Sequence, residues 1–427
     1  MEIGLTRRSV LASAIGAAAG CRRNRSDGVG GAPVTLVWYA GSMTNTHQDP
    51  RRALIDAFQK ERPDVRIELV SLPSDTETQR RTLEKAITRA SNDPVPDVYT
   101  GDSIWPAEFA AKKLVRPLDD DFPDEVFARF PEELLAAAGY GQGTYAVPFR
   151  ADQSVLLYRK DLLDRAERKA PETWEDLVRT ASHVLRTSGD RRLRHGFLWQ
   201  GKAYEGLTCV WTEFATDAGV NLDRLQVDTP EALRALSFMR ELVDGPLSRG
   251  VTDMDELASL ESFRSGEAVF LRAWSSNYLG LTASDLSHRQ VGIAPMPGFA
   301  GGRAGASTIG GWHLYLNPFG RHQEQAKAFV QWLTGPVAQL ILAQYSTLPV
   351  NEAVQDHPAV QNNPGLSIPL KVRKVQRPST TPRYSEVSRI LYTEVHQALN
   401  GDDPATALKR AQNRLDAVLR EPGTAPR

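Results

Sequence analysis

Cysteine is scarce in this sequence, and its scarcity limits what can stabilise the fold. The 427 residues include two cysteines, Cys21 and Cys209. If Cys21 is modified, no disulfide can form within the mature chain, and Cys209 is expected to be a small buried hydrophobic residue. The eight histidines show no ligand spacing such as HExxH, and no Gly-rich phosphate loop follows a strand pattern. The sequence therefore predicts neither a bound metal nor a cofactor.

An excess of either charge is also missing. Lys and Arg number 51 against 52 Asp and Glu, which gives a formal net charge of −1. A protein without a basic surplus is a poor candidate for nucleic-acid binding. Beyond the first 21 residues no apolar run approaches the roughly 20 residues needed to span a membrane. A hydrophobic content of 41% is enough for ordinary cores, and a chain of this length should divide into two or three compact units.

The N-terminus has the features of an export signal. Arg7 and Arg8 form a positive start, and residues 9–20 are apolar or small throughout. This run is too short for a membrane-spanning helix. Residues 6–11, TRRSVL, resemble a twin-arginine export signal. The alternatives are an ordinary cleavable secretory signal and a cytoplasmic N-terminus that is merely apolar.

The end of that segment resembles a bacterial lipobox. Residues 18–21 read AAGC, and in a lipobox the cysteine is acylated and becomes the new N-terminus. Residues 22–32 are basic and Gly-rich, as in a flexible tether. We therefore expect residues 1–21 to be a signal peptide with a lipobox and Cys21 to carry lipid. A cleavable signal without lipid is the alternative.

After the predicted tether, the sequence shows alternating strand and helix patterns. Strands are predicted at 34–39, 65–72 and 97–99, and helices at about 50–62 and 77–90. Such an alternation predicts a mostly parallel sheet with helices on both faces. Ligands of these sheets bind outside the carboxyl ends of the strands.

Later segments continue the same kind of pattern. Residues 143–149 are predicted as a hairpin or strand that leads out of the first unit, and 151–158 as the apolar strand that follows, with its apolar run at 154–158. Thr173 and Asp176 have capping-box spacing, which opens a helix. A strand at 310–316 and helices at 230–242, 323–333 and 403–419 complete the pattern.

Tryptophans outside apolar helices are the first candidate binding residues. Trp199, Trp274 and Trp312 lie among Gly, Ser or polar residues, whereas Trp174 and Trp332 are expected to pack in cores. The apolar face of a sugar ring stacks on an indole, and its hydroxyls need polar partners. A buried core position is the alternative for each.

Carboxylates and one arginine are the second group of candidates. Asp102, Asp152 and Glu205 lie beside strand ends or turns, where they could accept hydrogen bonds from hydroxyls. In a glycosidase, two such groups would act as acid and base about 5–10 Å apart. Arg377 lies in an extended Pro-containing stretch, where its fork could hold two hydroxyls or a carboxylate. Exposed turn caps and a surface ion pair are the alternatives.

Taken together, these residues resemble a known family. The segments 152–163, 173–177, 310–312 and 326–335 are similar to bacterial extracellular solute-binding proteins of sugar-importing ABC systems, maltose-binding type. The resemblance implies an α/β fold of type II with two lobes, each a mostly parallel sheet flanked by helices, and a ligand cleft between them. It implies a hinge near residues 149–152. The expected lobes are 33–149 with 297–347, and 150–296 with 348–420.

A narrower resemblance points to trehalose/maltose-binding lipoproteins. Residues 199–209, 97–110 and 377–384 carry it. It implies that six side chains lie in the sugar cleft: Asp102, Asp152, Glu205, Trp274, Trp312 and Arg377. It also implies that Ser42 and Asn45, in the first loop, add polar contacts.

The expected function follows from this resemblance. We expect a non-enzymatic, monomeric receptor, anchored by Cys21 to the outer face of the cell membrane, that closes on a glucose disaccharide and passes it to membrane permease subunits. Trehalose is the expected ligand, with maltose or other α-glucosides as the alternative. A secreted glycoside hydrolase using Asp102, Asp152 or Glu205 is the rival from another class.

Overall fold

The computed structural model describes residues 32–41, 43, 49–73, 76–89, 93–279, 281, 286, 290–301 and 305–420. Cys21 and the predicted signal segment lie outside the described residues, as do Ser42 and Asn45. Among the described residues, no helix has both the length and the apolar character that a membrane span requires.

The first elements follow the predicted alternation. They are β1 (Val34–Gly41), α1 (Pro50–Glu61), β2 (Val65–Leu72), α2 (Thr76–Ile87) and β3 (Val98–Asp102). Helix α1 begins where predicted because the Asp49 side chain accepts a hydrogen bond from the backbone N–H of Arg51, and Pro50 suits the first turn. Strand β1 pairs in parallel with β2 and β3, so the carboxyl ends of these strands share one edge.

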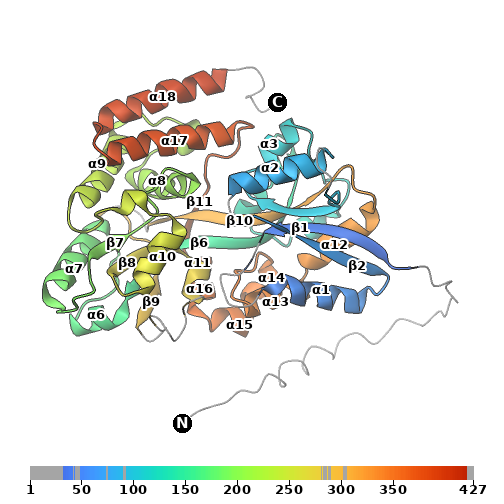
Figure 1. Ribbon diagram of the computed structural model, residues 1–427, viewed down its shortest axis with the longest axis horizontal. Coiled ribbons are helices and arrows are strands. Elements are labelled where there is room, and N and C mark those ends of the chain that lie inside the picture. The colour runs from blue at the N-terminus through green and yellow to red at the C-terminus, as the bar shows by residue number, and fades with distance from the viewer. Residues whose placement is uncertain are drawn as a thin grey trace, which may run out of the picture. The chain divides into compact units, whose positions relative to one another are not determined.

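One sheet of nine strands forms the framework (Figure 1). Its order is β2-β1-β3-β10-β6-β8-β7, with β11 on β10 and β9 on β6. Strand β10 is antiparallel to β3 and β6, and β6 is antiparallel to β8 and β9, whereas β7 with β8 and β10 with β11 are parallel. The bounds of these strands are β6 (Val147–Arg159), β7 (His195–Leu198), β8 (Ala268–Trp274), β9 (Val291–Ala294), β10 (Ala306–Leu316) and β11 (Arg373–Val375).

Strand β6 corrects one prediction. The sequence pattern suggested two pieces, at 143–149 and 151–158, but β6 is one strand of 13 residues. Only Gly143–Thr144 (β5) belongs to a separate small hairpin, with Gly139–Tyr140 (β4). Arg150 lies at the break between the two predicted pieces, because a charged residue interrupts the apolar pattern that marks a buried strand. Because β6 pairs first with β10 and then with β8 and β9, it joins both parts of the sheet.

Helices cover the sheet, and their starts follow local capping chemistry. The hydroxyl of Thr173 accepts a hydrogen bond from the backbone N–H of Asp176 at the start of α7, as the capping-box spacing predicted. The remaining helices are α3 (Pro106–Ala111), α4 (Asp124–Phe127), α5 (Glu132–Ala136), α6 (Lys160–Arg165), α7 (Trp174–Thr187), α8 (Glu205–Ala218), α9 (Pro230–Asp244), α10 (Glu256–Arg264), α11 (Ser275–Leu279), α12 (Gln323–Leu333), α13 (Pro336–Gln344), α14 (Glu352–Gln355), α15 (Pro358–Gln361), α16 (Pro364–Leu370), α17 (Tyr384–Leu399) and α18 (Pro404–Arg420).

Two large hydrophobic cores lie along this sheet. The first takes buried residues from 36–151 and 309–366, and the second from 156–296 and 387–415. Val360 and Leu366 pack in the first core, although residues after 347 were expected in the other lobe. The lobe boundaries themselves stay a prediction.

Candidate functional site

A row of three residues crosses β3, β10 and β6 where the sheet passes from one core to the other. Trp312 of β10 pairs with Asp102 of β3 on one side and with Arg150 of β6 on the other. Directly paired residues of antiparallel strands project from the same face, with Cβ atoms roughly 4.5–5.5 Å apart. The Cζ atom of Arg150 lies 5.0 Å from the centre of the Trp312 ring. The row therefore brings together a carboxylate, an indole and a guanidinium.

The same face continues along β6. Side chains alternate along a strand, so Asp152 shares the face of Arg150 and is paired with Gly310 of β10. Ser154 follows on that face, opposite Trp274 of β8. A Cβ atom at Gly310 would lie 2.8 Å from the Trp274 ring, so the glycine lets the indole lie against β10. Four predicted residues, Asp102, Asp152, Trp274 and Trp312, thus belong to adjoining positions of one sheet.

Arg377 joins two of the predicted carboxylates. Its Nη2 donates to Oδ1 of Asp102 at 2.9 Å, and its Nη1 donates to Oε1 of Glu205 at 2.8 Å. Arg377 is only 6% exposed, so these are buried, charge-assisted hydrogen bonds. Glu205 begins α8, and its carboxylate also accepts hydrogen bonds from the hydroxyls of Tyr384 and Ser388 on α17. The predicted Asp102, Glu205 and Arg377 therefore form one network.

The charges in this network stabilise one another. Burial raises the pKa of Glu205, while the neighbouring Arg377 favours its charged form. Burial alone would lower the pKa of Arg377, but Asp102 and Glu205 hold it well above its usual range. Both oxygens of Glu205 accept hydrogen bonds from the protein. In the described part of the chain, no protein donor reaches Oδ2 of Asp102. That oxygen can accept a hydrogen bond from a ligand.

Asp152 is held by the start of α11. Its Oδ1 accepts hydrogen bonds from Ser275 Oγ at 2.6 Å and from the backbone N–H of Ser276 at 3.2 Å. Its Oδ2 accepts one from Ser276 Oγ at 2.6 Å. Because each carboxylate oxygen has two lone pairs, these contacts fix the Asp152 side chain and leave Oδ2 able to accept another hydrogen bond.

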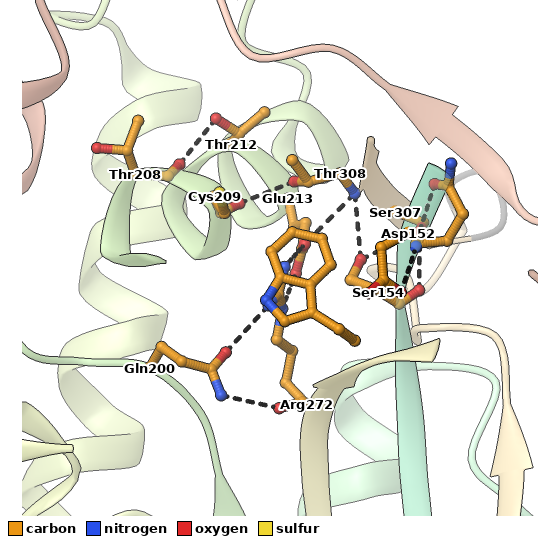
Figure 2. Close-up of polar contacts among 12 residues, drawn as sticks. Asp152, Ser154, Gln200, Thr208, Cys209, Thr212, Glu213, Arg272, Ser307 and Thr308 are labelled. Carbon is orange, nitrogen blue, oxygen red and sulfur yellow. Dashed lines mark hydrogen bonds and ion pairs between the residues drawn. The ribbon is translucent and has the colours of Figure 1, made fainter. Parts of the chain in front are cut away.

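A buried ion pair supports Trp274. The guanidinium of Arg272 lies over the Trp274 ring, with its Cζ atom 4.2 Å from the ring centre. Glu213 of α8 holds that guanidinium through two hydrogen bonds, of 2.6 and 3.2 Å, and Gln200 accepts a third at 3.0 Å (Figure 2). Glu213 also accepts a hydrogen bond from the backbone N–H of Thr308 on β10. The Trp274 ring is thus fixed through α8, β8 and β10 together.

The three candidate tryptophans differ in their burial. Trp199 is fully buried in the second core, so it is a packing residue. Trp274 and Trp312 each keep partial exposure. Cys209 is buried, as predicted, and burial raises the pKa of its thiol. Among the described residues, no cluster of His, Cys, Asp and Glu is arranged to hold a metal ion.

Arg150 is the site residue that sequence reasoning missed. Burial lowers the pKa of its guanidinium to about 10, against the opposing effect of the Asp152 and Asp102 charges. Its signal in the sequence was the spacing to Asp152, because residues i and i+2 of a strand share a face. That signal required knowing that β6 is continuous through residue 150.

Comparisons with known proteins identify the family and the fold. Residues 44–340 match the bacterial extracellular solute-binding proteins. A probable ABC transporter-binding protein of Deinococcus radiodurans is 27% identical over 404 residues, which are 90% of this chain and 94% of that protein. Among solved structures, maltose-bound MalE3 of T. maritima is 29% identical, with a TM-score of 0.79, over 90% of this chain and all of that chain.

A second solved structure agrees in fold. The GacH receptor of Streptomyces glaucescens is 22% identical with a TM-score of 0.79, covering 91% of this chain and 99% of that one. The two-lobe α/β fold expected from the sequence is confirmed, but the strands form one mixed sheet, not a mostly parallel sheet in each lobe, because β10 and β6 run antiparallel to their main neighbours. The matching family consists of binding proteins, not enzymes. The chain belongs to the bacterial extracellular solute-binding protein family.

Proposed function

We propose that this protein is the receptor of an ABC sugar importer and captures a glucose disaccharide, preferentially trehalose, between its lobes. The observation that carries the proposal is the row of Asp102, Trp312 and Arg150 across three strands, with Trp274 on the adjoining positions. A sugar presents an apolar ring face and a rim of hydroxyls, so it needs an indole together with charged hydrogen-bonding groups.

The similar proteins support an importer of this kind. The Deinococcus radiodurans relative is described as a probable ABC transporter-binding protein, and MalE3 of T. maritima was solved with maltose. A maltotriose-binding protein of Pyrococcus abyssi is 22% identical over 343 residues, or 78% of this chain and 70% of that protein. Maltose or another α-glucoside is therefore the second candidate ligand.

The anchor belongs to the same proposal. A lipid on Cys21 and a tether over 22–32 would hold the receptor at the outer face of the membrane, where the local concentration beside permease subunits is high. Detergent phase partitioning of the full chain expressed in a bacterium tests this. The wild type should enter the detergent phase and Cys21→Ser should remain in the aqueous phase. A wild type that stays aqueous would contradict the anchor.

A thermal-shift titration tests the ligand. Trehalose should raise the Tm as its concentration rises, because a ligand at 100 times its Kd stabilises the folded state by about 2.7 kcal/mol. Asp102→Asn should lose most of this shift, since a hydroxyl would meet a weaker acceptor. Asp56→Asn, at a carboxylate 59% exposed on α1, is the matched control and should keep the shift. A response to maltose alone selects the second candidate, and no response to either sugar refutes the proposal.

A further inference from the structure

Arg150 differs from the other arginines of the site because its guanidinium lacks protein acceptors. Arg272 and Arg377 each make at least three side-chain hydrogen bonds. Within the described chain, no protein oxygen accepts a hydrogen bond from Arg150, and its Nε is fully buried without a partner. A buried donor without an acceptor is unfavourable, so such a group calls for an explanation.

The position of Arg150 explains why its donors have no acceptor in the protein. Its guanidinium is held over the face of Trp312, 5.0 Å from the ring centre, so the fork is oriented by stacking and its N–H groups are unused. Trp312 is also paired with Asp102, whose Oδ2 has no protein donor among the described residues. The row thus carries unused donors at one end and an unused acceptor at the other.

We infer that Arg150 contacts the ligand directly and that, together with Oδ2 of Asp102, it selects a neutral polyhydroxyl ligand over an acidic one. The inference rests on the proposed function and deepens it by naming the ligand class. A hydroxyl group can accept from Arg150 and donate to Asp102, whereas a carboxylate or phosphate can only accept.

The charges around the row agree with a neutral ligand. Asp102, Asp152, Glu205 and Glu213 contribute four carboxylates, against the three guanidinium groups of Arg150, Arg272 and Arg377. An added anion would face this negative surplus in a site where burial strengthens electrostatic repulsion. Arg150 therefore serves as one hydrogen-bonding fork within a site that is not cationic overall.

Binding measurements on Arg150→Met and Arg150→Lys test the inference. Isothermal titration with trehalose and maltose should show at least ten-fold weaker binding for Arg150→Met, and an intermediate loss for Arg150→Lys, which keeps the charge but not the fork. Arg52→Met, at a side chain 80% exposed, is the control and should bind like the wild type. Gluconate and glucuronate should not bind the wild type. Unchanged affinity in Arg150→Met, or wild-type binding of either acid, overturns the inference.

A second readout separates contact from structural support. Without ligand, the Tm of Arg150→Met should stay close to that of the wild type, because the loss of the contact with Trp312 is offset by removal of a buried donor that lacks an acceptor. A fall of several degrees would make Arg150 a structural residue and overturn the inference. Deoxy analogues of the bound sugar test the contact further. Removal of one particular hydroxyl should weaken binding to the wild type but not to Arg150→Met. If removal of each hydroxyl weakens binding equally in both proteins, direct contact is contradicted. If the wild type binds no sugar, the proposed function and the ligand class fail together, while the Tm comparison still decides whether Arg150 is structural.

Discussion

The buried pair of Arg272 and Glu213 allows one prediction to be worked out in detail. The perturbation is Glu213→Gln, which keeps the shape of the side chain and removes its charge. The side chains of Arg272 and Glu213 are 1% and 0% exposed, so water cannot replace the lost carboxylate. The amide of the glutamine can accept only with its oxygen, and its NH₂ group would face the N–H groups of Arg272.

The expected magnitude follows from this burial. Removing one partner of a buried ion pair destabilises a protein by about 3–5 kcal/mol, because the remaining charge has no compensation. Arg272→Met should be destabilising by a similar amount, since it leaves the Glu213 carboxylate buried. The double variant Arg272→Met with Glu213→Leu should be less destabilised than the sum of the single changes, because no unpaired charge remains.

Urea denaturation followed by circular dichroism measures these free energies of unfolding. Asp56→Asn is the control, because Asp56 forms a surface pair with Arg52 and should change stability by less than about 1 kcal/mol. Two results would refute the claim that each charge of this pair compensates the other. One is a fall of less than about 1 kcal/mol in the free energy of unfolding of Glu213→Gln. The other is a double variant whose destabilisation equals the sum of the two single changes.

Three further predictions concern the site and its surroundings. Gly310→Val should displace the Trp274 ring, which an added Cβ would approach to 2.8 Å, and weaken sugar binding in titration while unfolding remains cooperative. Arg377→Met should weaken sugar binding and lower the free energy of unfolding, because it leaves Asp102 and Glu205 without their shared cation; unchanged values in both measurements contradict that role. Burial raises the pKa of Asp217 to about 7, so the folded state binds more protons than the unfolded state between about pH 4 and 7. Stability should therefore fall by up to about 4 kcal/mol as pH rises through that window, and Asp217→Asn should remove this part of the pH dependence in urea unfolding.

Local chemistry made much of the fold predictable. The Asp49-Pro50 and Thr173 caps identified helix starts, and the bounds of the 323–333 helix and the 65–72 strand agree with α12 and β2. These signals depend on neighbouring residues alone. The continuity of β6 was missed because its polar side chains lie between two cores, where a hydrophobic pattern reads them as an interruption.

The candidate site was predictable only in part, because local sequence gives the type and position of a residue but not its distant partners. Residue type and position beside strand ends or turns identified Asp102 and Glu205, and position in an extended stretch identified Arg377; the structure brings their side chains together. The partners of a charged side chain depend on register and on distant segments. Arg377 lies 275 residues beyond Asp102 in the chain, so no local pattern could show that they form an ion pair. Arg150 could be placed beside Asp152 only once β6 was known to be one continuous strand.

The two cores are assembled from interleaved parts of the chain, and this affects how the protein is made. The second core uses residues 156–296 but also buried side chains of α17 and α18, through Leu415. During synthesis, its early strands and helices leave the ribosome well before these last helices exist. Their apolar surfaces therefore stay exposed to solvent, or bound by a chaperone, until translation is nearly complete. Premature termination before α17 would consequently yield an aggregation-prone chain rather than a receptor with one working half.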